Sequence, residues 1–178
     1  MTAGAWTGTL LPALANYLEP ERQVLGWFQP TDREQFAPER FPVFVAEVPE
    51  GHYYGFPVCE VPGFKIGKYH HQGETGSPIQ VSREPTQEDE DLLRQFTERY
   101  VPAGAGPTMR LLTCMFTNTP DEDFVLDTHP DHDNVVVGAG FSGHGFKFAS
   151  VVGEILADLA LDCDTDYSTD IFELSRFE

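Results

Sequence analysis

Residues 134–161 read NVVVGAGFSGHGFKFASVVGEILADLAL and contain three consecutive signals. The β-branched run Val135, Val136 and Val137 predicts a buried strand. Apolar residues at helical spacing over 146–161 predict a helix with one apolar side. The eight residues between strand and helix include four glycines, Gly138, Gly140, Gly143 and Gly145. A strand that feeds a glycine-rich turn and a helix start gathers backbone N–H groups at the positive end of a helix dipole. This arrangement is typical of a site for an anion or a cofactor.

Two familiar motifs resemble this turn, and neither fits it well. The spacing of Gly138, Gly140 and Gly143 matches the dinucleotide pattern G-x-G-x-x-G. That pattern also needs a second strand after the helix, and residues 162–178 offer only one weak strand. A hydrolase nucleophile at Ser142 would need glycine at position 144, where the chain has His144. A plain connection without a ligand stays open, although four glycines exceed what a turn needs.

Composition restricts the class of protein. The chain has 178 residues, 40% of them hydrophobic, with a formal net charge of −18. Such a charge disfavours nucleic acids and anionic membranes as partners, because both bind basic surfaces. The three cysteines are far apart and odd in number, which favours a reducing compartment, and we expect a cytoplasmic protein. No apolar run is long enough to cross a membrane.

The periodicities predict an α+β protein. We expect one helix within residues 7–18, strands at 22–29, 41–48, 52–58 and 63–71 in an antiparallel meander, and a helix over 85–100. Further strands are expected at 110–117 and 123–127, before the opening stretch. The acidic runs at 84–91 and 121–133 are interpreted as solvated faces. Residues of roughly 20 to 105 should form one sheet with a helix, and the remainder a second part.

Several side chains could carry chemistry, and the spacing leaves their roles open. Lys65 and Lys68 point to opposite faces of a strand, and the spacing fits both a lysine that enters a pocket and lysines that protect a sheet edge. His70 and His71 also face opposite sides. Cys114 lies in mid-strand, where a buried inert thiol is the default.

The remaining polar candidates are equally open. Lys147 could be a surface lysine, and Tyr53 and Tyr54 fit either a core or an aromatic ligand wall. His129 and His132 with the neighbouring Asp131 and Asp133 are residue types that can bind a metal. We predict no metal site, because the segment has the sequence of a turn and no second ligand cluster has zinc spacing.

A wider set of motifs, in order along nearly the whole chain, resembles one family. The motifs are Leu112-Thr-Cys-Met-Phe-Thr-x-Thr-Pro-Asp-Glu-x-Phe124, His129-Pro130, Asn134-Val-Val and Gly140-Phe-Ser-Gly-His-Gly-Phe-Lys-Phe148, together with 2–6, 22–24, 53–57 and 65–67. They resemble the C-terminal half of the monomeric sarcosine oxidases and of their relatives N-methyltryptophan oxidase and pipecolate oxidase.

The resemblance implies an FAD-dependent oxidase of secondary amines or N-methyl amino acids. The amine becomes an imine that water hydrolyses, and O₂ is reduced to hydrogen peroxide. The implied fold is an antiparallel or mixed substrate-domain sheet plus the C-terminal strand–turn–helix portion of a GR2-type FAD-binding fold. The implied domains are 1–18, the end of an FAD-binding domain; 19–107, a substrate domain; and 108–178, a return to the FAD-binding domain.

The resemblance also implies roles for particular residues. Cys114 would bond covalently to the flavin, and Lys65 would promote O₂ reduction by electrostatic stabilisation. Tyr53 and His70 would be catalytic and would line the substrate pocket. Lys147 would pair with the substrate carboxylate close to the flavin. The flavin would be held by the turn residues Gly140, Phe141, Ser142, Gly143, His144 and Gly145.

Three departures from the family pattern carry consequences. Phe116 stands where members often have tyrosine, which removes a hydroxyl near the substrate. An extra residue after Lys65 leaves His70 or His71 as the matching histidine. The family's N-terminal G-x-G-x-x-G unit has no counterpart in 1–178, so we expect a missing N-terminal half or a partner chain. Without it, we expect an exposed apolar surface beside Val135–Val137. We also expect that the chain is inactive by itself. Alternatives are a non-catalytic remnant or binding subunit, and an unrelated module that binds small acids.

Overall fold

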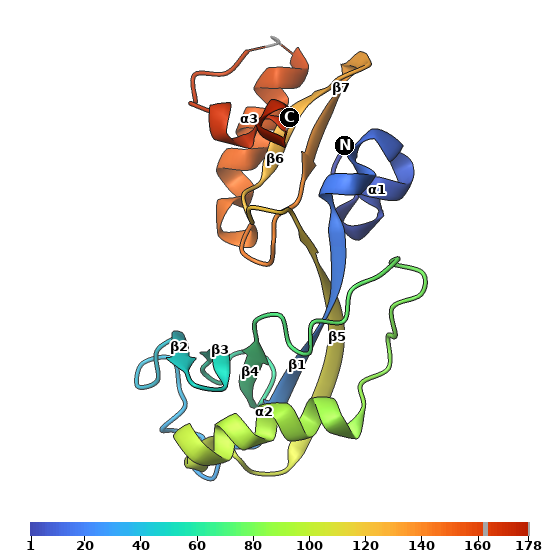
Figure 1. The fold of residues 1–178 in the computed structure, drawn as a ribbon. Helices are drawn as coiled ribbons and strands as arrows, with labels where there is room; N and C mark the ends of the chain where they lie inside the picture. The colour runs from blue at the N-terminus through green and yellow to red at the C-terminus, as the bar shows by residue number, and fades with distance from the viewer. Residues whose placement is uncertain (162–163, 178) are drawn as a thin grey trace. The chain divides into compact units, whose positions relative to one another are not determined.

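The computed structural model describes residues 1–161 and 164–177. They divide into two compact units (Figure 1). Unit 1 comprises Met1–Glu21, Thr75–Gln80 and Met115–Glu178, and unit 2 comprises Arg22–Glu74 and Val81–Cys114. Two strands, β1 (Glu19–Phe28) and β5 (Thr108–Asn118), contribute residues to both units. The domain boundaries expected from the family resemblance stay a prediction.

Unit 2 is built on a sheet with the strand order β2-β3-β4-β1-β5. Strands β2 (Phe44–Val48), β3 (Gly51–Phe56) and β4 (Phe64–Lys68) form an antiparallel meander, with the predicted turn between β2 and β3. β1 pairs antiparallel with β4 and not with β2, so the expectation that all four strands follow in chain order was wrong. The Pro-rich loop after β1 is long enough to return the chain to the far edge of the sheet.

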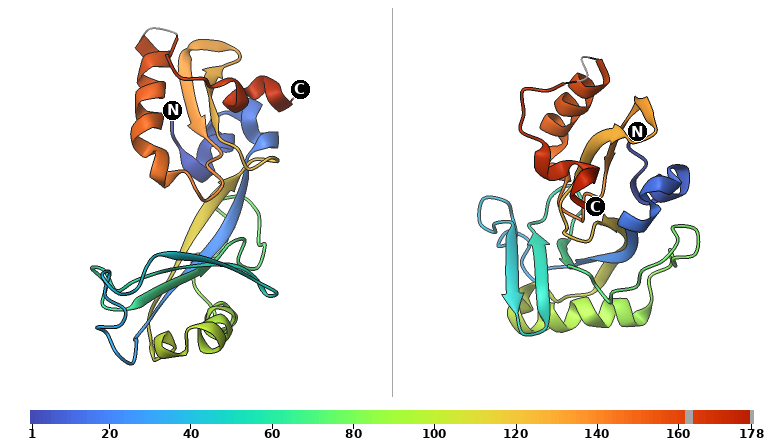
Figure 2. Two further views of the ribbon diagram at one scale, coloured as in Figure 1. Left: turned by 90° about the vertical axis from the view of Figure 1, so that its left-hand side faces the viewer. Right: turned by 45° about the horizontal axis from the view of Figure 1, so that its top comes forward.

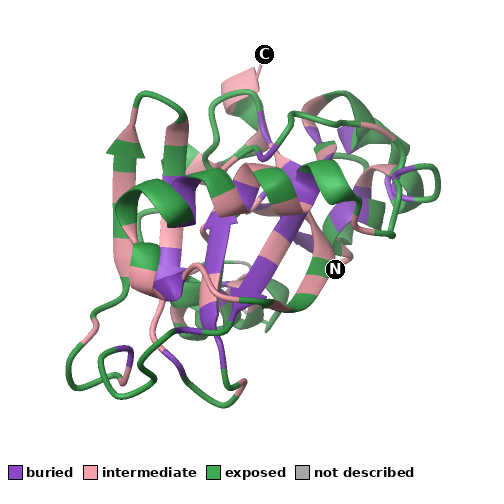
Figure 3. Cartoon of the chain, turned by 90° about the horizontal axis from the view of Figure 1, so that it is seen from below, coloured by how far each residue is buried: buried purple, intermediate pink, exposed green. Residues whose placement is uncertain are grey.

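Helix α2 (Gln87–Tyr100) lies across one face of this sheet (Figure 3), and its prediction is confirmed. Thr86 and Asp89 form a capping box at its start, which satisfies amides that have no partner inside the helix. Leu93 and Phe96 point from the helix into the sheet. They pack there with Val24, Phe28, Phe36, Tyr53, Val58, Phe64 and Ile66, the core of the unit.

Unit 1 is built on an antiparallel hairpin, β6 (Val125–His129) and β7 (His132–Ala139), as Figure 2 shows. One face packs on α3 (Ala149–Leu161) through Leu126, Val152 and Ile155. The other face packs on the N-terminal helical turns through Leu11, Leu14, Leu18, Val125, Val137 and Ala139. The predicted strand and helix of residues 134–161 are therefore confirmed.

The valines of β7 are covered, so the expected exposed apolar surface does not occur at these positions. Val137 is fully buried and Val136 is 9% exposed. Met1 pairs with β7 through two hydrogen bonds. Its amino group donates to the Val136 carbonyl, and its carbonyl accepts from the Gly138 amide at 2.9 Å. The exposed apolar side chains lie elsewhere in the unit and include Leu10, Phe146, Leu161 and Ile171.

Two expected elements differ at the ends of the chain. The single helix over 7–18 is broken at Pro12 into a 3₁₀ turn (Gly4–Trp6), α1 (Thr7–Leu10) and a second 3₁₀ helix (Pro12–Tyr17), because proline removes a helix donor. The weak strand after α3 is replaced by 3₁₀ turns at Asp170–Phe172 and Leu174–Phe177. Cys163 lies outside the described residues. Among those described, no helix has the length and apolarity needed to cross a membrane.

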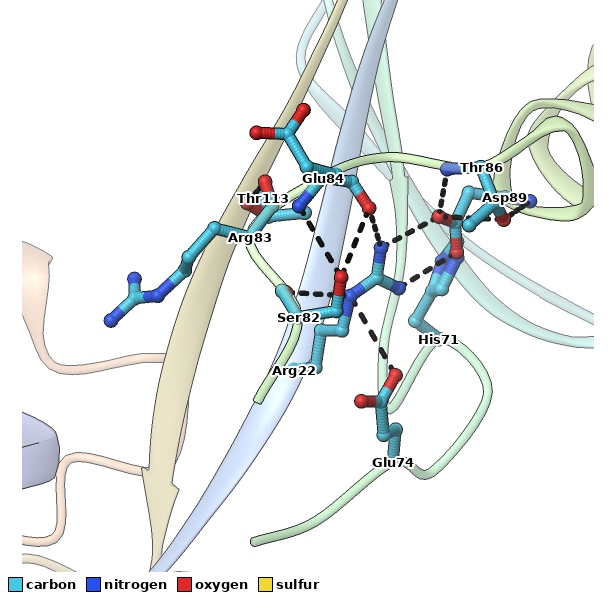
Figure 4. Close-up of polar contacts among 9 residues, drawn as sticks. All are labelled: Arg22, His71, Glu74, Ser82, Arg83, Glu84, Thr86, Asp89 and Thr113. Atoms are coloured by element: carbon cyan, nitrogen blue, oxygen red, sulfur yellow. Dashed lines mark hydrogen bonds and ion pairs between the residues drawn. The ribbon is translucent and has the colours of Figure 1, made fainter. Parts of the chain in front are cut away.

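A buried polar cluster connects α2 to β1 and to the turn after β4 (Figure 4). Arg22 donates from Nη1 and Nη2 to the two carboxylate oxygens of Asp89, at 2.8 and 2.7 Å. His71 Nε2 donates to Asp89 Oδ1 at 2.8 Å. The Thr86 amide and hydroxyl donate to Asp89 Oδ2 at 2.7 and 3.1 Å. The side chains of Arg22, His71 and Asp89 are at most 3% exposed, so the interpretation of the whole 84–91 run as a solvated face was wrong at Asp89.

Burial and charge in this cluster shift two pKa values downward. Burial lowers the pKa of His71 below 6.5; the bond to Asp89 opposes this, while Arg22 and Lys68 add to it. Burial would raise the pKa of Asp89, but the bonds from Arg22, Thr86 and His71 outweigh it and hold the pKa well below 3.8. His71 is therefore neutral and Asp89 ionised at neutral pH.

We predict that acid destabilises unit 2 in two steps. Below about pH 6.5 the unfolded chain binds a proton at His71 that the folded chain does not, so the free energy of unfolding decreases as the pH is lowered. Below about pH 4 the unfolded chain likewise binds a proton at Asp89 that the folded chain does not, and the free energy of unfolding decreases further. Urea unfolding across this pH range measures both steps. His71→Gln should remove the upper step and keep the lower one. A free energy of unfolding that is constant between about pH 7 and pH 5 would contradict the assignment.

Candidate functional site

The face of the unit 2 sheet opposite α2 carries Lys65. The strand registers place Trp27 and Phe56 directly beside Lys65 on neighbouring strands. The Lys65 ammonium lies 4.8 Å from the centre of the Phe56 ring and 5.4 Å from that of Trp27. No carboxylate among the described residues forms an ion pair with it. Lys65 is thus a half-buried cation held by aromatic rings, with its charge available to a ligand.

Cys114 and Tyr54 belong to the same face. Tyr54 lies opposite Gly67 in the register, two pairs along from Lys65 and therefore on the same face. Burial raises the pKa of the Cys114 thiol, and the charge of Lys65 opposes the rise. Burial also raises the pKa of Tyr54, with smaller contributions from Cys114 and Tyr69. Alternation along β5 from Arg110, whose guanidinium lies 5.9 Å from the centre of the Trp27 ring, also puts Cys114 on this face. A thiol, a phenol and an ammonium group therefore belong to one side of the sheet.

Tyr53 does not share this face. It lies opposite Lys68 in the register, is 3% exposed, and stacks on Phe96 of α2 with 4.1 Å between ring centres. A side chain enclosed in the core cannot contact a ligand on the other side of the sheet. The expected substrate-pocket role of Tyr53 therefore does not fit its placement, and the neighbouring Tyr54, which sequence reasoning left undecided, has the suitable position.

The two histidines after β4 differ in burial and in the residues that they contact. His71 is buried in the cluster with Asp89. His70 is exposed and follows Tyr69, with 6.5 Å between their ring centres. The Tyr69 ring in turn packs edge-on against Tyr54 at 5.2 Å. His70 is thus the histidine connected to the Lys65 face, which agrees with its choice from the sequence.

Gln23 is a further candidate that sequence reasoning missed. Strand alternation puts it on the side of Leu25 and Trp27, and therefore on the side of Lys65. Gln23 is fully buried, and neither polar atom of its amide has a hydrogen-bond partner within 1–161 and 164–177. A buried amide without partners is costly, so it indicates a missing ligand or water. Its only sequence signal was a polar residue inside an apolar strand.

In unit 1, the glycine-rich turn borders a cavity of ≈ 250 Å³. The lining residues are Gly4, Met115, Phe116, Thr117, Gly140, Phe141, Ser142, Gly143, Gly145 and Phe146. Gly143 has φ +78°, and a Cβ there would lie 2.4 Å from the Phe116 ring. Gly140 has φ +62° and equally little space beside Thr119. Glycine at these two positions lets bare backbone form the cavity wall.

Hydrogen bonds within the turn decide which of its amides can bind a ligand. The Ser142 amide donates to the Thr117 carbonyl at 3.1 Å, and the His144 amide donates to the Phe141 carbonyl at 2.9 Å. The amides of Gly140, Phe141, Gly143 and Gly145 have no acceptor in the described part of the chain. The expectation that the turn presents N–H groups to a ligand is therefore narrowed to these four residues, because Ser142 and His144 are excluded.

Several side chains of the turn also form hydrogen bonds within the protein. Ser142 is buried and its hydroxyl donates to the Gly140 carbonyl at 3.1 Å. His144 Nε2 donates to the Glu122 carbonyl at 3.0 Å. Lys147 is exposed, and its ammonium donates to the His144 carbonyl at 2.8 Å. Phe146 is 96% exposed. Lys147 thus stands at the start of the helical segment with donors left for an anion.

The described residues contain no group of three or more His, Cys, Asp or Glu side chains with metal-binding geometry. His129 instead accepts from the Asp131 amide through Nδ1, as in a turn. Taken separately, the unit 2 face offers a cation and a thiol among aromatic rings, and the unit 1 turn offers a backbone-walled cavity with free amides. Both features suit a flat aromatic group with polar edges.

Comparison with known proteins assigns the chain to a family. The profile of the family described as FAD dependent oxidoreductase matches residues 1–159. Monomeric sarcosine oxidase of Bacillus sp. (strain NS-129) is 45% identical over 180 residues, which cover 99% of this chain and 46% of that protein. N-methyl-L-tryptophan oxidase of Escherichia coli (strain K12) is 41% identical over 182 residues, with 99% and 46% covered.

Solved structures share the fold at lower identity. An Amadoriase I mutant from Aspergillus fumigatus superposes with a TM-score of 0.78 at 24% identity, over 96% of this chain and 41% of that one. L-proline dehydrogenase from P. horikoshii gives 0.76 at 24% identity, over 98% and 45%. The chain spans about half the length of the curated relatives it matches. From the match over residues 1–159, the chain belongs to the FAD dependent oxidoreductase family.

Proposed function

We propose that the protein oxidises a secondary amine, of the N-methyl amino acid class, with FAD as cofactor and O₂ as electron acceptor. One observation carries the proposal: Cys114, Lys65 and Tyr54 belong to the same face of the unit 2 sheet, and the charge of Lys65 opposes the rise in the pKa of the Cys114 thiol. The similarity to sarcosine and N-methyltryptophan oxidases supports this class of substrate.

The residues present fit a flavin. The wall at Gly140 and Gly143 has no room for a Cβ, which suits the close approach of backbone to a flat ring. The amides of Gly143 and Gly145 are free to donate to polar atoms on the ring edge. We propose that this turn (Gly140, Phe141, Ser142, Gly143, His144 and Gly145) holds the ring, with Cys114 bonded to it and Lys147 nearby.

When bound, FAD would supply the redox chemistry, in which the amine loses two electrons and two protons to become an imine and O₂ gains two electrons and two protons to become hydrogen peroxide. The imine is then hydrolysed by water. The role proposed for Lys65 is electrostatic. Its half-buried ammonium, without a paired carboxylate among the described residues, stabilises negative charge that develops on O₂.

The substrate would be held by complementary charge and shape. Lys147 has donors free for the carboxylate of an amino acid, although it now donates to the His144 carbonyl. Tyr54 and His70 are the polar side chains of the unit 2 face that could orient the amine. Phe116 offers an apolar ring where a hydroxyl is expected from the family resemblance. The proposed partners are therefore a small amino acid and O₂.

A second candidate function is that of a binding subunit. Because the chain spans about half of its relatives, residues 1–178 could form the flavin site only together with another polypeptide. Flavin that is retained by residues 1–178 alone, with oxidation of an amine, would exclude this candidate. Flavin and activity that appear only with a second chain would support it.

We predict a covalent flavin on Cys114. The protein, purified as its gene encodes it, should stay yellow after denaturation and precipitation, and should form peroxide from sarcosine. Cys114→Ala should lose the retained colour, because no other thiol of residues 1–161 and 164–177 belongs to this face. Cys59→Ala is the matched control, since Cys59 is exposed and belongs to the loop after β3. Colour that is absent from the unchanged protein, together with no peroxide from N-methyl amino acids, would refute the proposal.

We predict that Lys65→Met slows reoxidation of the reduced protein by O₂ by about a hundredfold or more, because the charge that stabilises reduced oxygen is lost. Stopped-flow mixing of the reduced protein with O₂ measures this step separately from amine oxidation. Lys65→Arg should keep most of the rate, and Lys68→Met is a control on the opposite face of the same strand. Equal rates for Lys65→Met and the unchanged protein would contradict the role.

We predict that Gln23→Leu stabilises the ligand-free protein by about 1 kcal/mol or more, because it removes a buried amide without partners. It should also weaken flavin or substrate binding, if that amide bonds to either. Urea unfolding without ligand measures the first effect. A loss of stability in the variant would show that protein or water already satisfies the amide.

A further inference from the structure

We propose that Arg22, Asp89 and His71 form a positioning cluster that fixes the turn after β4 and thereby sets the imidazole of His70 on the Lys65 face. The proposal rests on the function proposed above. It concerns residues that contact no reacting atom themselves. The observation behind it is a fully hydrogen-bonded buried carboxylate next to a strained turn.

The turn 69–73 has an unfavourable backbone. His70 has φ 57° and His71 has φ 31°, two consecutive residues in the left-handed region, and Gly73 follows with φ 70°. This region is energetically unfavourable for a residue that has a Cβ. The turn's own bonds are His71 N–H to the Lys68 carbonyl at 3.2 Å and Gly73 N–H to the His70 carbonyl at 2.5 Å. Such strain persists only where the surroundings enforce it.

The cluster provides this enforcement from both sides of the turn. Asp89 accepts the His71 Nε2–H, which holds the buried imidazole at one end. Arg22 holds the other end, because its backbone amide donates to the Glu74 carbonyl at 2.8 Å and its guanidinium lies 3.6 Å from the Glu74 carboxylate. Arg22 also donates to the carbonyls of Ser82 and Glu84, at 3.0 and 3.1 Å. Figure 4 shows these contacts around the guanidinium.

Fixing His71 determines where His70 points. His71 turns into the cluster under α2, while His70 remains exposed beside the Tyr69 ring. Tyr69 is itself held by its contact with Tyr54 and by its amide, which donates to the His52 carbonyl at 2.9 Å. A turn released from Asp89 would relax toward ordinary φ values and move the imidazole of His70. Arg22 and Asp89 are therefore positioning residues, and His70 is the group they position.

A double-mutant cycle tests this coupling with kcat/KM for sarcosine. Asp89→Asn should lower kcat/KM about ten- to hundredfold, because misplacing a binding group by about 1 Å has an effect of this size. In the His70→Asn background, Asp89→Asn should cause little further loss. Arg94→Gln is the matched control: it breaks another ion pair of α2, with Glu90 at 2.8 Å, and its effect should be independent of His70.

A second variant keeps the test valid if Asp89→Asn does not fold. His71→Leu leaves the Arg22–Asp89 pair intact and cuts only its bond to the turn, so it should act like Asp89→Asn in the cycle. Losses that add with His70→Asn for both Asp89→Asn and His71→Leu would overturn the proposal. Equal losses from Arg94→Gln and Asp89→Asn at equal stability would overturn it as well.

A readout without turnover separates this proposal from the proposed function. The NMR signals of the His70 imidazole should shift in Asp89→Asn and His71→Leu and should stay in place in Arg94→Gln. If the unchanged protein oxidises no amine, the proposed function fails. The positioning role is then tested only by whether the His70 imidazole signals shift in Asp89→Asn and His71→Leu. Unchanged His70 signals in both Asp89→Asn and His71→Leu would refute it.

Discussion

The bidentate ion pair between Arg22 and Asp89 connects three parts of unit 2 that are far apart in the sequence. Asp89 caps helix α2 through Thr86, pairs with β1 through Arg22, and holds the turn after β4 through His71. A single carboxylate thus accepts five hydrogen bonds, two from Arg22, two from Thr86 and one from His71. Asp89 thereby connects the start of α2 to β1 and to the turn after β4, while Leu93 and Phe96 pack the helix on the core face of the sheet.

The energetic contribution of such a pair is smaller than its hydrogen bonds suggest. Removing two charges from water costs several kcal/mol each, so a buried ion pair adds little stability relative to apolar residues of the same volume. A well-packed apolar trio could hold α2 on the sheet. It could not keep His70 and His71 in left-handed conformations, because that requires directional bonds to particular atoms. The pair is therefore better explained by the geometry it imposes than by stability.

Much of the fold was predictable from local patterns, whereas the faces of the sheet were not. Period-two and period-3.6 signals predicted the strands and the helix α2, since each depends on neighbours within a few residues. Whether Tyr53 or Tyr54 faces a ligand depends on strand register, which is set by partners in β4. The burial of Asp89 was equally hidden, because its partner Arg22 lies 67 residues away and the acidic run around it has the composition of a solvated surface.

The glycine-rich turn is a second place where the sequence predicts the backbone but not which atoms are available to a ligand. Its sequence predicts converging amides, and the glycines at 140 and 143 do form a backbone wall. However, a ligand can use only the amides that the protein leaves unpaired, and the bonds of Ser142 and His144 are made within unit 1. The unpaired amides belong to Gly140, Phe141, Gly143 and Gly145, whereas those of Ser142 and His144 are used by the protein itself. Which amides of such a turn stay unpaired is decided by contacts with Thr117 and within the turn, and the glycine motif alone does not reveal it.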